Sequence, residues 1–260
     1  MNNKQKKALD NASFLRIDEL GSNPVNGNFD INHLKEIHRR IFQDAPKYNP
    51  FFKVGVFRPE LDQDGEWSKI RKLENEEYRT FYSPRSELET QLDKVLRDGI
   101  EVLRSVGKNK EKFIEAMAKF YGDIDYLHPF GDGNSRTLRE FTRQLALEIG
   151  FNLDWGKALN NPRAMEILYI ARDKEVTDRF FPFADKEYFR NNGKQLIVQM
   201  KAGEWDGDYL TISCITLYGK YADSKPLIDI IRDATTLLEA SREKSQKATK
   251  RKNRGRGLEL

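Results

Sequence analysis

Twelve consecutive residues, His128 to Arg139, combine side chains and backbone that suit work on a polyphosphate. Gly131, Gly133 and Asn134 precede a segment that predicts a helix beginning near Ser135. The first turn of a helix offers unpaired N–H groups and the positive end of the helix dipole, so it binds anions. Because glycine has no side chain, the backbone at these positions can approach an anion closely.

Charged side chains in the same segment supply the rest of a transfer site. Arg136 and Arg139 are three residues apart on the predicted first turn, so both project from one side and offer forks that match phosphate oxygens. Asp132 supplies a hard oxygen ligand of the kind that Mg²⁺ uses beside phosphates. His128 lies at the other lip, and an imidazole can accept a hydroxyl proton near neutral pH. The set predicts phosphoryl or nucleotidyl transfer, in which positioning and charge neutralisation supply most of the catalysis.

The elements that must position this segment are mainly helical. Apolar residues at helical spacing predict helices over residues 30–43, 83–107, 110–127, 137–149, 161–175, 187–203 and 226–250. Residues 1–29 read as a loose or partly helical lead-in. Ser68–Leu73 and Tyr78–Tyr82 predict a short hairpin across residues 74–77. The predicted fold class is all-α, with a small β-hairpin and extra C-terminal helices.

Several polar residues near the segment have plainer interpretations. We expect Asp123 and Asp125 on exposed turns of the 110–127 helix, rather than in a metal cluster with Asp132. We expect His33 and His38, on the 30–43 helix, to be structural or surface residues.

The segment from His128 to Arg139 resembles the signature of the Fic (Fic/Doc) family. That signature runs His, Pro or another residue, Phe, any residue, Asp or Glu, Gly, Asn, Gly, Arg, any two residues, Arg. The one departure is Ser135, where the family has its second glycine. The resemblance implies a Fic helical core over residues 30–203. It also implies a protein adenylyltransferase that moves AMP from ATP to a Ser, Thr or Tyr hydroxyl of a target protein, with Mg²⁺ as cofactor.

The resemblance also implies a role for each residue of the motif. His128 is the general base for the target hydroxyl, Phe130 anchors the loop in the core, and Asp132 binds Mg²⁺ between the α- and β-phosphates. Arg136 contacts the β-phosphate and Arg139 the γ-phosphate. The implied nucleotide-binding residues are Gly131, Gly133, Asn134, Ser135, Arg136 and Arg139. The implied target-binding flap is the hairpin at about 68–82, with Tyr78, Arg79, Thr80, Phe81 and Tyr82.

Ser135 leaves two alternatives open. Family members altered at this position can bind the nucleotide in another orientation and act as kinases. The first alternative is therefore transfer of another nucleotide monophosphate or of a phosphate. The second is a degenerate nucleotide-binding interaction module without catalysis.

The C-terminal part divides into a helical extension over residues 204–241 and a basic tail over 242–260, which we expect to be disordered at its end. The stretch from Thr235 to Glu239 is the nearest match to the inhibitory helix of the family, in which Ser or Thr, three residues and Glu precede Gly or Asn. Ala240 fails the last position. Glu239 is thus the candidate autoinhibitory residue. A separate small antitoxin-like protein, or no inhibitor, is the alternative.

The bulk composition limits the class of protein. The 260 residues are 38% hydrophobic and 33% charged, with a net charge of +4, and a chain of this length can bury a sizeable core. Residues 242–256 hold eight basic residues and one acidic residue, a surplus of +7, so the remainder carries 4 − 7 = −3. The basic tail is a flexible solvated segment, a contact for nucleic acid or an anionic surface, or a secretion or localisation signal.

The sequence shows neither a membrane span nor a Sec signal peptide. No apolar run approaches the roughly 20 residues of a membrane span, and no apolar segment follows the basic start, so we expect no Sec signal peptide. A single cysteine, Cys214, excludes a disulfide framework. We expect a cytoplasmic protein, or an effector secreted into a host cell.

Overall fold

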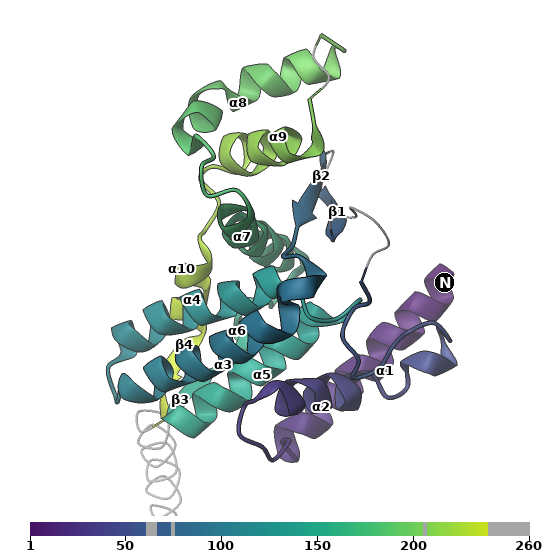
Figure 1. The fold of residues 1–260 in the computed structure, drawn as a ribbon, viewed down its shortest axis with the longest axis vertical. Helices are drawn as coiled ribbons and strands as arrows, with labels where there is room; N and C mark the ends of the chain where they lie inside the picture. The colour runs from purple at the N-terminus through teal and green to yellow at the C-terminus, as the bar shows by residue number, and fades with distance from the viewer. Residues whose placement is uncertain (61–66, 74–75, 205–206, 239–260) are drawn as a thin grey trace, which may run out of the picture.

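Helices make up most of the computed structural model, which describes residues 1–60, 67–73, 76–204 and 207–238 (Figure 1). The helices are α1 (Asn3–Ser22), α2 (Ile31–Phe42), α3 (Leu88–Ser105), α4 (Lys110–Leu127), α5 (Asn134–Ile149), α6 (Trp155–Ala158), α7 (Pro162–Phe180), α8 (Lys186–Lys201), α9 (Tyr209–Cys214) and α10 (Leu227–Ala234). A π-helical stretch, Ile215–Lys220, continues α9, and two 3₁₀ turns span Ala45–Lys47 and Arg85–Glu87. The predicted fold class is confirmed. Within the described residues, no helix has the length and apolar composition needed to cross a membrane.

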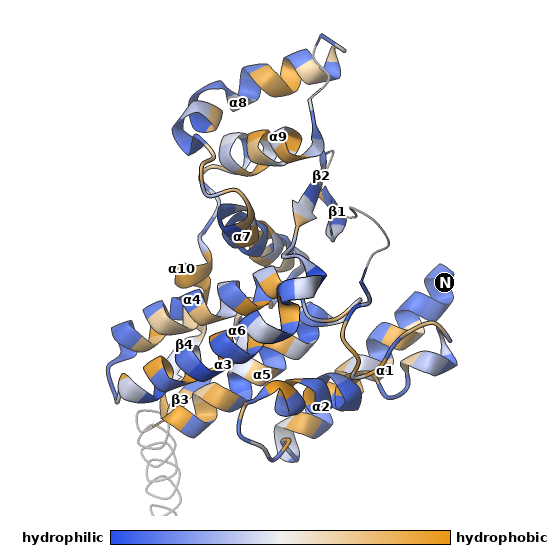
Figure 2. Cartoon of the chain, in the orientation of Figure 1, coloured by the Kyte–Doolittle hydropathy of each residue, from blue (hydrophilic) through white to orange (hydrophobic). Residues whose placement is uncertain are grey.

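Helix α4 lies at the centre of the main core. It packs against α3, α5, α7 and α10, and ten of its eighteen residues are buried. Asn109 begins it as N-cap, because its side chain accepts the backbone N–H of Lys112. It ends at His128, whose φ of 46° lies in the left-handed region. Hydrophobic and hydrophilic residues alternate along the neighbouring helices, as expected where one face is buried (Figure 2).

The N-terminal segment forms a full helix rather than a loose lead-in. Asn2 and Gln5 make a reciprocal capping box at the start of α1. The helix packs on α2 through buried Leu9 and Leu20, and Arg16 pairs with Asp44 at 2.8 Å. Helix α1 is therefore part of the folded body.

The predicted hairpin is present, and its second strand begins earlier than predicted. Strands β1 (Ser68–Leu73) and β2 (Glu76–Phe81) pair antiparallel, and Lys69 lies opposite Thr80. Strand β2 begins two residues before the predicted start at Tyr78. A second hydrophobic cluster packs the hairpin against α7 and the α9 region, and its buried members are Leu73, Tyr78, Ile170, Cys214, Leu217 and Tyr218. Helix α7 and the α9 region thus support one face of the hairpin.

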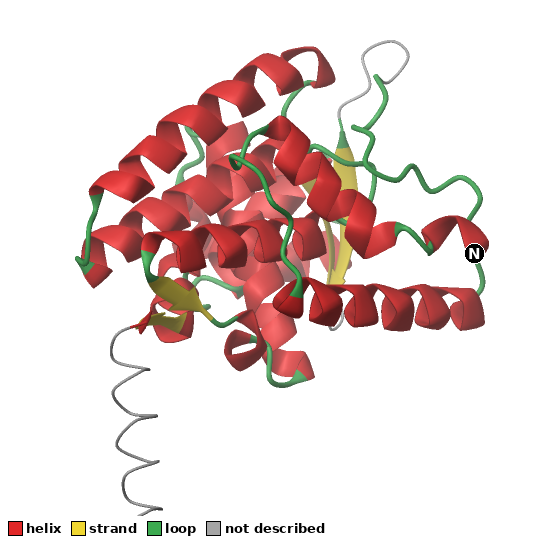
Figure 3. Cartoon of the chain, turned by 90° about the horizontal axis from the view of Figure 1, so that it is seen from below, coloured by secondary structure: helices red, strands yellow, loops and turns green. Residues whose placement is uncertain are grey.

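The predicted helix over 226–250 is wrong after residue 234. Thr235–Leu237 forms strand β4, which pairs antiparallel with β3 (Phe151–Leu153), a strand that the sequence analysis missed. Consecutive threonines favour extended backbone, and β3 offers them a partner. Figure 3 shows this strand pair and the hairpin at separate places in the helical body. Residues 239–250 lie outside the described residues, and the division at residues 29, 203 and 241 stays a prediction.

A buried ion pair joins α4 to α7. The Arg172 guanidinium makes two contacts with the Asp125 carboxylate, at 2.6 and 2.8 Å, and both side chains are only 2% exposed. Our expectation of an exposed Asp125 is therefore wrong, because α7 covers this turn of α4. The carboxylate holds the pKa of Arg172 well above its ordinary value despite burial.

We expect Asp125→Asn to lower the free energy of unfolding by about 3 kcal/mol or more, since it leaves a buried guanidinium without its counter-charge. Urea denaturation measures the loss. Asp93→Asn is the matched control, because the Arg97–Asp93 pair is 65% exposed on both sides and contributes less than about 1 kcal/mol. Equal losses in the two variants would contradict the prediction.

Candidate functional site

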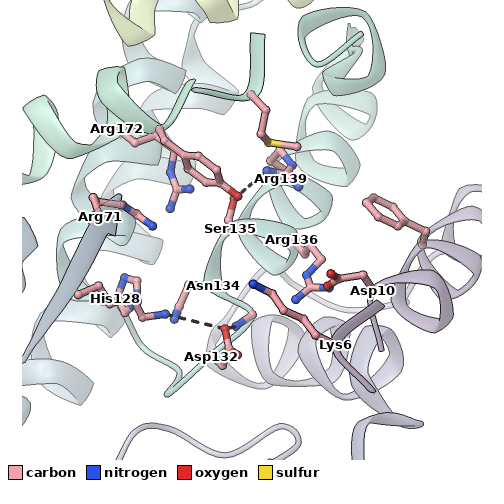
Figure 4. Close-up of a pocket in the computed structure, with 15 residues that line it drawn as sticks. Lys6, Asp10, Arg71, His128, Asp132, Asn134, Ser135, Arg136, Arg139 and Arg172 are labelled. Atoms are coloured by element: carbon pink, nitrogen blue, oxygen red, sulfur yellow. Dashed lines mark hydrogen bonds and ion pairs between the residues drawn. The ribbon is translucent and has the colours of Figure 1, made fainter. Parts of the chain in front are cut away.

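A cavity of about 390 Å³ opens at the N-terminal end of α5. Its wall comes from four parts of the chain, as Figure 4 shows: α1, β1, the 128–139 segment and α7. The segment contributes His128, Asp132, Gly133, Asn134, Ser135, Arg136 and Arg139. The sequence prediction had already grouped these seven residues. The others, which it missed, are Lys6, Asp10, Phe14, Lys69, Arg71, Met165, Tyr169 and Arg172.

The loop between α4 and α5 is held from within. Gly133, with φ of 81°, is the N-cap of α5, and a Cβ atom built there would lie 2.3 Å from the Phe42 ring. Only glycine therefore fits this position. The Asn134 amide accepts the Phe130 N–H at 2.9 Å and donates to the Phe130 carbonyl at 2.6 Å. Phe130 is 1% exposed and belongs to the main hydrophobic core, whereas Gly131 does not line the cavity. The anchoring role of Phe130 stays a prediction.

Two buried side chains outside the segment fix the same loop. His38 Nδ1 accepts the Gly55 N–H at 2.9 Å, so the proton lies on Nε2, which donates to the Asp132 carbonyl at 3.0 Å. Its ring stacks on Phe130 at a centroid distance of 3.9 Å. Arg58 donates from Nε to the His128 carbonyl at 3.0 Å. His38 is structural, as expected, but its spacing gave no sign that it holds this loop.

His128 is buried in the cavity wall in a form that can accept a proton. It is 2% exposed and stacks on Tyr82 at a centroid distance of 3.7 Å. Neither ring nitrogen has a hydrogen-bond partner among the described residues. Burial, then the positive charges of Lys69 and Arg172, lower the pKa of His128 well below its ordinary value. The imidazole is therefore neutral at pH 7.

The cavity holds more positive than negative charge. Asp173 pairs with Arg71 at 2.7 Å, and Arg172 has Asp125. Arg139 is only 9% exposed and has no carboxylate partner in the described part of the chain; its one hydrogen bond is to the Ser135 hydroxyl. Burial lowers its pKa. A buried cation without a counter-charge is costly, so the cavity suits an anion.

Strand β1 also contributes charge to this cavity. Lys69 Nζ lies 3.9 Å from the Asp132 carboxylate, and burial lowers the pKa of Lys69. Asp132 itself is 61% exposed at the cavity edge. One accessible carboxylate beside an anion site fits Mg²⁺, which commonly uses one or two carboxylates together with phosphate oxygens. In the described residues no group of three or more His, Cys, Asp or Glu could hold a metal by itself.

The five predicted flap residues contact the rest of the chain. Tyr78 donates to Asp173 at 2.9 Å, Thr80 is buried, and Phe81 stacks on Phe180. Ser213 of α9 bonds both backbone groups of Arg79, which covers the outer edge of β2. Tyr82 stacks on His128, as described above. The hairpin side chains that line the cavity come from β1.

Glu239, the predicted autoinhibitory residue, lies outside the described residues. The residues before it, Thr235–Leu237, form β4 beside β3, which follows the C-terminal end of α5. The cavity is at the other end of this 16-residue helix, roughly 24 Å away at about 1.5 Å per residue. Arg139 is the sixth residue of this helix, so its Cα lies roughly 15 Å from the end that β3 follows, at about 1.5 Å per residue.

Helix α1 engages the cavity directly. The Arg136 guanidinium donates to Asp10 at 2.9 Å and to the Ser13 hydroxyl at 2.6 Å, and it lies over the Phe42 ring. Asp10 thus forms an ion pair with Arg136, the arginine that the sequence analysis predicts to contact the β-phosphate. The sequence gave no signal of this contact, since 126 residues separate the partners.

Comparisons with known proteins agree with this geometry. Residues 28–146 match the model of the Fic/DOC family. The chain is 27% identical over 146 residues to protein adenylyltransferase VbhT of Bartonella schoenbuchensis, covering 56% of this chain but 27% of VbhT. It is 28% identical over 161 residues to a probable protein adenylyltransferase Fic of Escherichia coli, covering 60% of this chain and 70% of that protein.

Solved structures show the same fold. The N-terminal Fic domain of a putative cell filamentation protein from Bartonella quintana, with bound ADP, superposes with a TM-score of 0.55 at 16% identity, covering 91% of this chain and 87% of that one. BepC of Bartonella tribocorum, with bound AMPPNP, gives a TM-score of 0.51 at 16% identity, covering 90% and 88%.

We expect Asp10→Asn to tighten binding of inorganic triphosphate about fivefold, because it removes a partly exposed ion pair that competes for Arg136 and contributes up to about 1 kcal/mol. Isothermal titration calorimetry measures the change. Asp18→Asn, the same charge change on an exposed part of α1, is the control. Unchanged or weaker binding by Asp10→Asn would show that the contact does not oppose an anion.

We expect none of the three histidines to titrate near pH 6.5 in the native protein, since burial is the largest effect on each and lowers each pKa, that of His38 to about 4. Between pH 6.5 and about 4 the unfolded chain then binds more protons than the native chain. The free energy of unfolding therefore falls as the pH falls, by up to about 1.4 kcal/mol per pH unit for each histidine.

Imidazole C2–H chemical shifts and urea denaturation at pH 7, 6 and 5 measure these two effects. In a His38→Gln protein, the free energy of unfolding should depend less steeply on pH, because the contribution of His38 is lost. A native histidine that titrates between pH 6 and 7 would contradict the assignment for that residue.

Proposed function

We propose that this chain is a protein adenylyltransferase of the Fic/DOC family, because residues 28–146 match the model of that family. It would transfer AMP from ATP to a Ser, Thr or Tyr hydroxyl of a target protein. The observation that carries the proposal is the arrangement of buried Arg139, without a carboxylate partner among the described residues, in the same cavity as neutral His128. The names of VbhT and of the Escherichia coli relative support this activity.

His128 would act as the general base. The target oxygen bonds to the α-phosphorus, while the bond from that phosphorus to the bridging oxygen of the β-phosphate breaks. The hydroxyl proton goes to a ring nitrogen of His128, and pyrophosphate leaves with the bridging electrons. A neutral imidazole with no internal partner can accept that proton without first breaking another hydrogen bond.

The polyphosphate would lie against the N-terminal turn of α5. The backbone N–H groups there and the guanidinium groups of Arg136 and Arg139 provide donors with fixed positions. Fixed donors favour the charge that develops on the leaving pyrophosphate, because they need no reorganisation during the reaction.

Mg²⁺ would be held by Asp132 and the phosphates, and it would add charge neutralisation at the phosphorus. Among the described residues, the exposed Asp132 carboxylate accepts only the Gly133 N–H, at 2.7 Å, besides its weak contact with Lys69. Its remaining lone pairs are available for a cation. The backbone of the Asp132 loop is fixed by His38, so the carboxylate is presented from a rigid position.

We expect α-³²P-ATP to label a protein in a whole-cell lysate in the presence of Mg²⁺, and His128→Ala to reduce the rate at least 100-fold, the usual effect of losing a general base. His33→Gln, which changes a histidine outside the cavity, is the control. Thermal unfolding midpoints check that both variants fold. Because His128 is neutral in the protein without nucleotide, kcat/KM for ATP in the wild-type protein should be almost constant from pH 8 to pH 6.

Label transferred from γ-³²P-ATP but not from α-³²P-ATP would replace this proposal with a kinase. Nucleotide binding without transfer to any protein would favour the interaction module. Mass spectrometry of the labelled protein identifies the modified hydroxyl and the mass that was added.

A further inference from the structure

Ser135 contacts one of the two arginines of the predicted phosphate clamp. The hydroxyl lies at the second helical position of α5, and Arg139 follows four residues later on the same face. Arg139 Nη1 donates to Ser135 Oγ at 2.7 Å. Both side chains line the cavity, and a dashed line in Figure 4 marks the hydrogen bond between them.

Arg139 depends on this contact for its direction. Its guanidinium has no other hydrogen bond among the described residues and is 9% exposed. Burial is the largest effect that lowers the pKa of Arg139, and the positive charges of Arg172 and Arg136 also lower it, because they repel the guanidinium. A hydrogen bond to a charged group is among the stronger ones, and here it opposes that repulsion.

The Ser135 hydroxyl can still donate one hydrogen bond. A guanidinium can only donate, so Ser135 Oγ must be the acceptor in this pair. A serine hydroxyl also carries one hydrogen, and Ser135 donates it to no acceptor in the described part of the chain. That hydrogen can rotate toward an anion in the cavity. The helix N-terminus next to it offers N–H groups to the same space.

We propose that Ser135 is a positioning residue of the phosphate site, which holds the Arg139 guanidinium against the cavity and donates its hydroxyl hydrogen to the bound polyphosphate. The inference rests on the proposed function for the identity of the anion. It reverses the simple interpretation of the motif, in which serine in place of glycine is a defect. Glycine at this position removes both the acceptor for Arg139 and a donor for the anion.

The experiment compares wild type with Ser135→Ala, Ser135→Gly and Ser135→Thr. Isothermal titration calorimetry measures binding of inorganic triphosphate and of ATP. We expect Ser135→Ala and Ser135→Gly to weaken both about tenfold, the effect of losing a hydrogen bond to a charged group. Ser135→Thr keeps the hydroxyl and should remain within about twofold of wild type. Thermal unfolding midpoints confirm that the proteins fold.

A double-mutant cycle with Arg139→Met tests whether Ser135 acts through the arginine. In the Arg139→Met protein, Ser135→Ala should cost clearly less affinity than in wild type, because only the donated hydroxyl hydrogen remains to be lost. An equal cost in both backgrounds would overturn the positioning role. The positioning role would also be overturned if Ser135→Gly or Ser135→Ala bound triphosphate as tightly as wild type. The same holds if Ser135→Thr lost as much affinity as Ser135→Ala, or if wild type bound no triphosphate.

The transfer assay separates this inference from the proposed function. If α-label is transferred but the Ser135 variants bind alike, only the role of Ser135 is wrong. If triphosphate binding depends on the hydroxyl but no α-label reaches any protein, the role of Ser135 stands and the adenylyltransferase proposal fails.

Discussion

The site depends on how six residues between α4 and α5 are held. Helix α4 ends at His128 with left-handed backbone, and Gly133, also left-handed, begins α5. Such a turn places the His128 imidazole and a helix N-terminus on the same cavity, but it is not stable by itself. The Asn134 amide braces the turn from inside, whereas His38 and Arg58 bind its carbonyl groups from α2 and the following loop. The positions of the cavity-lining groups in this segment are therefore fixed largely by residues outside it, His38 and Arg58, which do not line the cavity.

A second constraint is the distribution of positive charge around that turn. Asp125 and Asp173 bind Arg172 and Arg71, and these pairs tie α7 to α4 and to the hairpin. They are framework contacts, since their carboxylates are buried and already satisfied. Arg139 has no such carboxylate in the described structure. The two arginines that hold the fold thus have carboxylate partners, whereas the positive charge of Arg139, which faces the cavity, has none among the described residues. An anionic ligand would balance that charge.

Much of this could be predicted from the sequence, for a physical reason. The motif is continuous, so its helix start, its arginine spacing and its glycines follow from local rules, and long amphipathic helices such as α3 have strong periodicity. Contacts between distant segments could not be predicted. Asp10 reaches Arg136 across 126 residues, and Asp125 is buried only because α7 covers it. Thr235 shows the same limit, since its extended backbone depends on β3 rather than on its own neighbours.

The positive charge has a further consequence for His128 within the proposed function. Burial, and then the positive charges of Lys69, Arg172 and Arg71, lower the pKa of His128 and keep the imidazole neutral in the protein alone. A polyphosphate in the same cavity would offset those charges, which removes the repulsion while burial remains. The pKa of His128 would then rise toward its ordinary value, and a base with a higher pKa takes a proton more readily. The same cations would therefore bind the donor nucleotide and make the base stronger only once that nucleotide is in place. Proton transfer would be coupled to substrate binding without any movement of the backbone.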